Sequence, residues 1–274
     1  MNLNNEDAIK TAEFTTEQWR DNLKNCGYDH QCQNLRDYKS AAHLSRVIKK
    51  CINHTKLKPG SRVLEIGCGG GVHLVKFFLN GFHADGIDSS PEVVERCNHY
   101  IEQVRKFERI ETNISVHCSD VFKYSVDSTY DLSYHFGVVE HFINRSDRMK
   151  IWNILYNSLK PGAWVMSVVP SGSHLLRSYI KKNGLCGYNI EEIDYSILNH
   201  ESEFIDAGFI DVYAYPWNFF GFLPDLMPNR PLRSVANVFQ KGANILIPNI
   251  RPFRRVSELY AHSLLVFGRR PTHA

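Results

Sequence analysis

The segment LEIGCGGG, residues 64–71, constrains the fold of this 274-residue chain more than any other feature. Glycine occupies four of its last five positions, directly after a short apolar run. Glycine loses more backbone freedom on folding than any other residue, so such a cluster is costly unless the backbone needs a positive φ or a very close neighbour. A strand, a glycine-rich turn and a helix start together form a corner that binds anions and nucleotides. The segment predicts such a corner.

Short apolar segments alternate with helical ones after this corner. Strands are predicted at residues 62–67, 83–88, 114–120, 130–137 and 163–170, and a further pair, 208–216 and 259–268, closes the chain. Helices are predicted at residues 71–80, from Pro91 with Ser90 as N-cap, through 147–162 and near 201–207. This alternation predicts an α/β fold with a doubly wound, mainly parallel sheet of seven strands.

Three parts of the chain depart from the alternation. Residues 1–56 are predicted to form N-terminal helices that act as a lid or cap, because apolar residues from Ala41 to Ile52 recur at steps of three and four. Residues 57–274 form the main domain. Within it, residues 171–200 and 217–255 are predicted insertions, the second lying before the last strand.

Composition limits the kinds of partner. A formal net charge of +3 is too small to imply a polyanionic partner, but the charge is unevenly distributed. From Pro228 onward the sequence contains eight lysines and arginines and one acid, Glu258. No secretory signal and no apolar run of the roughly 20 residues that span a bilayer is found. The seven cysteines are odd in number and scattered, which favours a reduced, cytoplasmic protein. Cys26, His30 and Cys32 lack a second ligand pair, so no metal site is predicted.

The spacing of the glycines separates two cofactor classes. The dinucleotide pattern G-x-G-x-x-G fits Gly67 and Gly69 but meets Val72 at its third place. The spacing Glu65-x-Gly67-x-Gly69-x-Gly71 instead resembles the first motif of class I S-adenosylmethionine-dependent methyltransferases, in their small-molecule branch. The resemblance continues through GIDSS, SDVF, YDLSYHFGVVEHF and SLKPGAWVMSVVP, and covers about residues 57–170.

The resemblance implies S-adenosylmethionine as the cofactor. It places Asp88 on the two ribose hydroxyls and Asp120 on the adenine amine. We expect Glu65, polar within a buried strand, to be satisfied by backbone amides near the loop or, through water, by the cofactor's ammonium group. The cofactor-binding residues predicted in this way are Glu65, Gly67, Cys68, Gly69, Gly71, Asp88, Ser89, Asp120, Val121, Phe136 and Gly137.

The methyl acceptor is predicted to be a small organic molecule, aromatic or apolar as in secondary metabolism, methylated at oxygen rather than at nitrogen or carbon. Methyl transfer needs a base only where the nucleophile loses a proton early. His135, Glu140 and His141 are the candidates, and the role is assigned to His135 and His141, with a structural histidine as the alternative for each. Candidate acceptor residues are Trp19, Tyr28, Trp217, Phe219, Phe220 and Arg251, for which packing of the insertion or a solvated basic face is the alternative.

Other functions stay open. An NAD(P)-dependent oxidoreductase shares the loop and the acid at the end of the second strand, and a catalytically silent protein could retain the cofactor site. An RNA or a lipid or quinone methyltransferase is a minority hypothesis, since the basic segment around Arg251 fits RNA or an anionic membrane. Nucleic acid is a less expected partner, because YHFG lacks the Asn/Asp-Pro-Pro-Tyr/Phe motif of amino-directed enzymes. The oligomeric state is not predicted.

Overall fold

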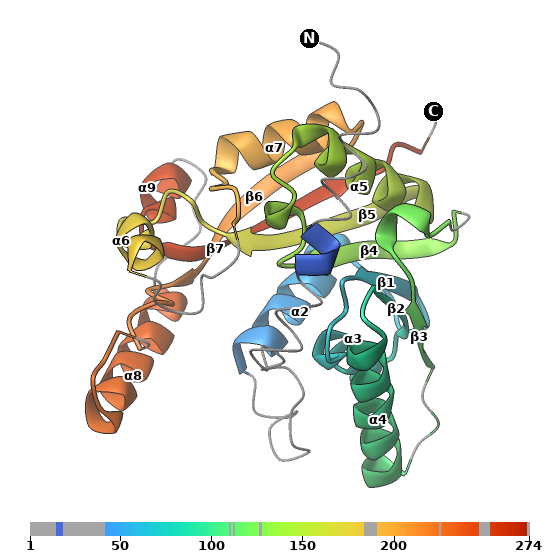
Figure 1. Ribbon diagram of the computed structural model, residues 1–274, viewed down its shortest axis with the longest axis horizontal. Coiled ribbons are helices and arrows are strands. Elements are labelled where there is room, and N and C mark those ends of the chain that lie inside the picture. The colour runs from blue at the N-terminus through green and yellow to red at the C-terminus, as the bar shows by residue number, and fades with distance from the viewer. Residues whose placement is uncertain are drawn as a thin grey trace.

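The computed structural model describes residues 15–18, 42–109, 111, 113–125, 128–183, 191–224, 226–246 and 253–272. In this part of the chain seven strands form one sheet in the order β3-β2-β1-β4-β5-β7-β6 (Figure 1). The strands are β1 (Arg62–Ile66), β2 (His83–Asp88), β3 (Ile114–Cys118), β4 (Tyr130–Phe136), β5 (Leu159–Pro170), β6 (Ile210–Phe219) and β7 (Ala261–Arg269). The predicted seven-stranded α/β fold is confirmed.

The sheet is mainly parallel. Strands β1 to β5 pair in parallel, whereas β7 lies between β5 and β6 and is antiparallel to both. The strand order reverses between β1 and β4, because the chain moves outward from β1 to β3 and then returns to the other side of β1. Ligands of open α/β sheets bind outside the carboxyl ends of the strands at such a switch point.

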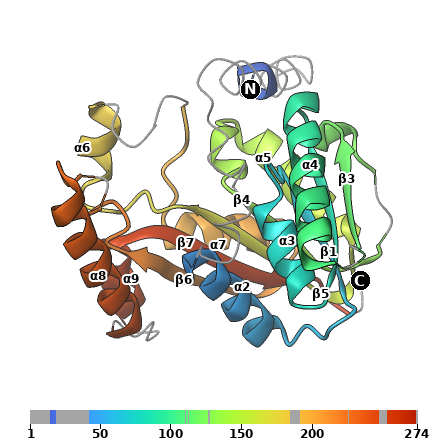
Figure 2. The same cartoon turned by 90° about the horizontal axis from the view of Figure 1, so that it is seen from below.

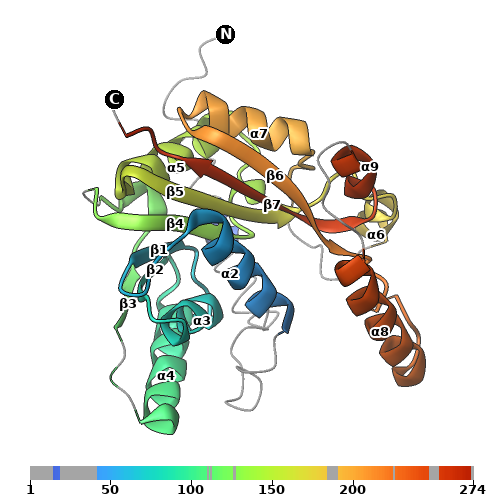
Figure 3. The same ribbon diagram turned by 180° about the vertical axis from the view of Figure 1, so that it is seen from behind.

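Helices cover both faces of the sheet (Figures 1 and 3). One face carries α2 (Ala42–Thr55), α3 (Val72–Leu79) and α4 (Pro91–Glu108), and the other carries α5 (Arg145–Ser158) and α7 (Ile197–Asp206). Three further helices, α6 (Arg177–Lys182), α8 (Arg230–Leu246) and α9 (Arg254–Glu258), gather at one end of the sheet in all three views (Figure 2). Helix α6 follows β5, α8 follows β6 and α9 precedes the antiparallel β7. All three therefore lie at the carboxyl edge of the parallel strands.

Each face has its own buried core because successive side chains of a strand point to opposite sides. Tyr134 of β4 packs against Phe77 of α3, with ring centroids 4.9 Å apart. The next residue, His135, faces Trp152 of α5 with centroids 5.5 Å apart. Helix α2, which lies within the predicted N-terminal cap, belongs to the first of these cores through residues such as Ile48.

The boundaries of the second predicted insertion are wrong at its start. Trp217 and Phe219 are residues of β6, paired in register with Ser263 and Ala261 of β7. Aromatic residues continue along this edge strand without a break, so the sequence gives no sharp end signal and the strand extends past Pro216. Strand β5 likewise starts earlier than predicted, and α7 begins inside the first predicted insertion.

Candidate functional site

The loop after β1 has a fixed shape that its glycines make possible. Gly67 and Gly71 have φ values of +63° and +78°, in the left-handed region that favours glycine. A Cβ on Gly67 would lie 2.6 Å from Cγ2 of Val138, and one on Gly71 would lie 2.5 Å from Sγ of Cys97. The close neighbours at these two glycines are therefore the segment after β4 and helix α4.

Asp88, the last residue of β2, holds the loop in place. Its Oδ2 accepts a hydrogen bond from the Gly69 N–H and its Oδ1 accepts one from the Ser90 N–H, both at 3.0 Å. Asp88 and the adjacent Ser89 are half-buried. A carboxylate offers about four lone-pair sites, so Asp88 can accept hydrogen bonds from a ligand as well as from the loop.

Asp120 lies at the same edge of the sheet as Asp88. It follows β3, which pairs with β2, and the Ser119 N–H donates to the Asp88 carbonyl oxygen at 2.9 Å. The Asp120 carboxylate is half-buried and accepts from the Phe122 N–H at 3.0 Å, which caps the short 3-10 helix η1 (Val121–Lys123). The two carboxylates predicted to hold ribose and adenine thus follow neighbouring strands.

The Cys68 side chain belongs to the core. Its thiol is buried, and a hydrogen bond with Cys97 together with burial raises its pKa. The Cys68 N–H donates to the Ile87 carbonyl oxygen at 3.0 Å. A contact between Cys68 and a cofactor therefore concerns its main chain.

Glu65 is satisfied by side chains, and our expectation of backbone amides is wrong. Its Oε1 lies 2.8 Å from Nδ1 of His73, and its Oε2 accepts from the Tyr134 hydroxyl at 3.2 Å. Burial raises the pKa of Glu65, and His73 and Tyr134 act in the opposite direction. The carboxyl group thus links β1 to α3 and β4 beneath the glycine loop.

His73 is a residue of this site that the sequence analysis missed. It lies in the first turn of α3, is buried, and stacks on Phe136 with ring centroids 3.6 Å apart. Its Nε2 has no hydrogen-bond partner among the described residues. A histidine two residues after the glycine run, in GGGVHL, was the available signal. Phe136 ends β4, and the following Gly137 has a φ of +68°, so both residues lie at the switch point.

The two predicted catalytic histidines lie in different surroundings. His135 is fully buried between α5 and α7, and burial, with smaller effects of His200 and His141, holds its pKa well below the usual value. His141 is half-buried in the 3-10 helix η2 (Val139–His141), and burial lowers its pKa to about 4. Both rings are neutral at pH 7 but weakly basic, so neither environment supports a general base.

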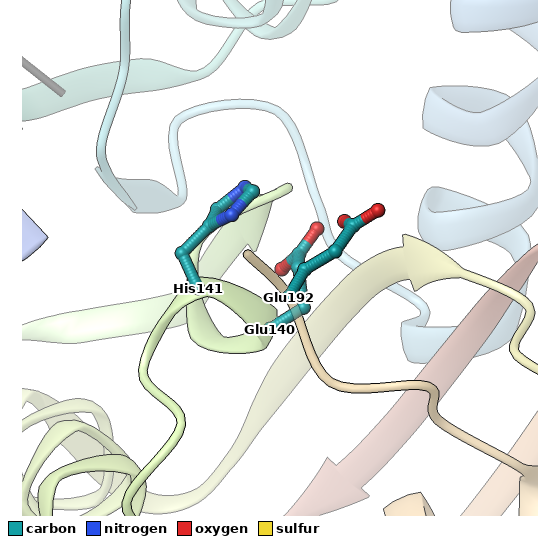
Figure 4. A group of neighbouring side chains, drawn as sticks. All are labelled: Glu140, His141 and Glu192. Carbon is teal, nitrogen blue, oxygen red and sulfur yellow. The ribbon is translucent and has the colours of Figure 1, made fainter. Parts of the chain in front are cut away.

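A buried group of acids lies beside His141. Atoms of Glu140, His141 and Glu192 that could bind a metal all lie within 4.8 Å of one another (Figure 4). Arg177, fully buried at the start of α6, pairs with Glu192 at 2.9 Å and with Asp194 at 2.5 Å. The guanidinium thereby supplies the positive charge that buried carboxylates require. Because these residues come from distant segments, their grouping had no signal in the spacing of the sequence.

Burial also raises the pKa of Glu140, to about 8, and the Glu192 carboxylate adds to this effect. The Oε2 of Glu140 has no partner among the described residues. Of the titratable groups directly after β4, Glu140 is therefore the one with a pKa close to neutral pH. Glu140 is one of the three candidates from the sequence, although the bases assigned there are His135 and His141.

The aromatic acceptor candidates are mostly packed. Phe219 is buried in β6, and Trp217 is partly buried against the core on the α2 face. Phe220 has a φ of +58° and packs against Phe239 of α8 and Tyr260, with centroids 5.2 and 5.8 Å away. Of the other candidates, Trp19, Tyr28 and Arg251 lie outside the described residues.

This sheet order and this glycine loop define a Rossmann-like methyltransferase fold, as predicted. The chain belongs to the methyltransferase family whose model, described as "Methyltransferase domain", matches residues 28–205. The match ends before β6, so β6, α8, α9 and β7 lie beyond it.

Relatives and solved structures agree with this family. The chain is 30% identical over 125 residues to a probable (S)-tetrahydroprotoberberine N-methyltransferase 2 of Papaver bracteatum, covering 44% of this chain and 32% of that protein. It therefore spans about a third of that relative. A Haemonchus contortus phosphoethanolamine N-methyltransferase 2 in complex with S-adenosyl-L-methionine matches with a TM-score of 0.61 and 15% identity, covering 92% of this chain and 60% of that one. The magnesium protoporphyrin IX methyltransferase of Synechocystis PCC 6803, with bound SAH, matches with a TM-score of 0.58 and 13% identity. The match covers 93% of this chain and 99% of that one.

Proposed function

We propose that this chain is an S-adenosylmethionine-dependent methyltransferase that acts on a small organic acceptor. The observation that supports the proposal most is the Asp88 carboxylate, which fixes the glycine loop at the switch point through the Gly69 and Ser90 N–H groups. Family membership and the cofactors in the solved structures of similar fold agree with it.

The residues present fit this cofactor. Asp88 would accept from the ribose hydroxyls in charge-assisted hydrogen bonds, and Asp120 with Val121 would hold the adenine. Phe136 and Gly137 would line the methionine portion. The buried Nε2 of His73 is an unpaired polar atom beside Phe136. With Nδ1–H donating to Glu65, Nε2 is an acceptor for an N–H donor such as the ammonium group of an amino acid.

The cofactor supplies a methyl carbon made electrophilic by its sulfonium. The chain contributes orientation and exclusion of water, for which a loop fixed by Asp88 and by the contact of Gly67 with Val138 is suited. Methylation at oxygen, which we favour, also needs a proton acceptor. Glu140 is better suited to that task than His135 or His141, because its pKa of about 8 lies near the working pH.

An aromatic or apolar acceptor agrees with the aromatic residues of β6 and the segment after it, although Phe219 serves packing. Cys51, Cys68, Cys97 and Cys118, the described cysteines, are free thiols, which supports a reducing compartment such as the cytoplasm. The antiparallel β7 disfavours the oxidoreductase hypothesis, because the dinucleotide fold closes with a parallel strand in the order 3-2-1-4-5-6.

Labelled methyl transfer tests the proposal. The protein is incubated with S-adenosylmethionine carrying an isotopic methyl label and with a metabolite extract, and labelled products are identified by mass spectrometry. We expect one labelled small molecule, absent with the Asp88→Ala variant. Cofactor binding without transfer to any component of the extract would instead favour the catalytically silent alternative.

A further inference from the structure

Helix α8 exposes an apolar face. Val235, Val238 and Ile245 are 67%, 70% and 76% exposed, and Leu232 and Phe239 are also exposed. These residues are spaced by three, four or seven positions, so they share one side of the helix. Large apolar side chains on one face of a helix indicate a site of interaction rather than scattered surface residues.

The opposite side of α8 is attached to the end of β6. The Asn244 side chain accepts from the Phe219 N–H at 3.0 Å and donates to the Phe219 carbonyl oxygen at 3.1 Å. Gln240 donates to the side chain of Asn218 at 2.8 Å, and Ala236 is buried. The polar face of the helix is therefore used for docking onto the sheet, and the apolar face is left toward solvent.

The charge of α8 is entirely positive. Its sequence, RPLRSVANVFQKGANIL, contains Arg230, Arg233 and Lys241 and no acid, and all three cations are exposed. Lys241 lies three residues after Val238 and four before Ile245, so it flanks the apolar face. Cationic side chains beside an exposed apolar helix face are typical of helices that lie in the interface of an anionic membrane.

Two helices at the same end of the sheet also expose apolar side chains. Exposed Leu175 and Tyr179 lie before and in α6, and exposed Phe253 and Val256 lie before and in α9. The two helices and α8 gather at one end of the sheet (Figures 1 to 3). Arg255 of α9 adds an exposed cation.

We propose that this end of the molecule docks onto the surface of an anionic lipid membrane through the apolar face of α8. The charge argues against a second copy of the chain as the occupant, because two α8 helices face to face would pair helices that carry only cations. No helix in the described part of the chain is long and apolar enough to cross a bilayer. This inference does not depend on the proposed methyl transfer.

Vesicle co-sedimentation tests the proposal with the full chain. Vesicles of phosphatidylcholine mixed with phosphatidylglycerol are compared with vesicles of phosphatidylcholine alone. We expect binding to the anionic vesicles, weakened by salt because the attraction is screened. Since each cation near an anionic surface contributes a factor of about five, the Arg230→Gln/Lys241→Gln variant should bind about 25-fold more weakly.

A second variant separates the apolar contribution. Val235→Asp/Val238→Asp changes two exposed positions, so the fold should be retained, and vesicle binding should be lost. Ile205→Asp, at a 61% exposed position of α7, is the matched control and should bind like the wild type. Equal sedimentation with both vesicle types, or a wild-type dimer in light scattering that Val235→Asp/Val238→Asp dissociates, would overturn the proposal.

Discussion

The carboxyl edge of the sheet has two halves that are held together in different ways. At β1 to β4, short-range hydrogen bonds fix the site: Gly69 to Asp88 across 19 residues and His73 to Glu65 across 8. At β5 to β7, ties come from far along the chain, as where Glu258 accepts from Ser173 and from the Ile197 N–H across 85 and 61 residues. The first half is a local motif that one long-range bond, from the Tyr134 hydroxyl to Glu65 across 69 residues, joins to β4. The bonds of the second half at Glu258 all join segments that meet only in the completed fold.

The two halves also differ in how their charged side chains are buried and paired. In the first half, the two acids at the carboxyl edge, Asp88 and Asp120, are half-buried and accept from backbone N–H groups, and Glu65 is buried beneath the loop. The second buries Arg177 completely between Glu192 and Asp194, and it pairs Arg254 with Glu201. The half-buried acids at the carboxyl edge thus lie in the first half, and the fully buried guanidinium lies in the second.

The largest expected effect is in the second half. Arg177→Met leaves the buried Glu192 carboxylate without its partner, so we expect a loss of about 3–5 kcal/mol in the free energy of unfolding. Urea denaturation measures it. The Arg177→Met/Glu192→Gln double variant should recover much of the loss, and a loss below about 1 kcal/mol in the single variant would show that the ion pair is not structural.

Gly67→Ala tests the first half. The new Cβ would lie 2.6 Å from Val138 at a φ of +63°, so we expect a loss of about 1–3 kcal/mol together with weaker cofactor binding. Gly60→Ala is the matched control, because Gly60 has a φ of +85° and no atom within 4 Å of an added Cβ. If both variants lose equal stability, the contact with Val138 has no cost and does not fix the loop.

Glu140→Gln tests the buried acid between the halves. A carboxyl group with a raised pKa in the folded state binds its proton more tightly there, so its contribution to stability is present at low pH and is lost as the pH rises from about 4.5 toward about 8. Relative to wild type, the variant should remove a slope of up to about 1.4 kcal/mol per pH unit in this window. Unfolding is measured across the pH range, with Glu95→Gln, an exposed position of α4, as control. An unchanged slope would contradict the assignment.

The smallest expected effect compares two helix starts. Ser196 accepts from the Asn199 N–H at 3.2 Å and caps α7, so Ser196→Ala should cost about 1 kcal/mol. Ser90 is the N-cap residue of α4, as predicted, but its hydroxyl donates to Glu92 at 2.9 Å and makes no capping bond. Ser90→Ala should therefore cost less in thermal unfolding. A larger loss at Ser90 would reverse this ranking.

The difference between the halves explains what the sequence could predict. The strands, the glycine loop and the acids at Asp88 and Asp120 follow one another at short, regular spacing, and the structure brings them to one edge. His73 was missed because a histidine inside an apolar helix start gives no sign of its partner, Glu65. The grouping of Glu140 with Glu192, and the end of β6 at Phe219, depend on contacts between distant segments, which no local pattern encodes.

Calorimetry with S-adenosylhomocysteine tests the central claim most directly. We predict saturable binding of one molecule per chain to the wild type. For Asp88→Ala, shown to be folded by circular dichroism, we predict binding on the order of 100-fold weaker, since about 3 kcal/mol of charge-assisted hydrogen bonding is lost. A wild type that binds neither this product nor S-adenosylmethionine, or an Asp88→Ala variant that binds as tightly as the wild type, would contradict the account.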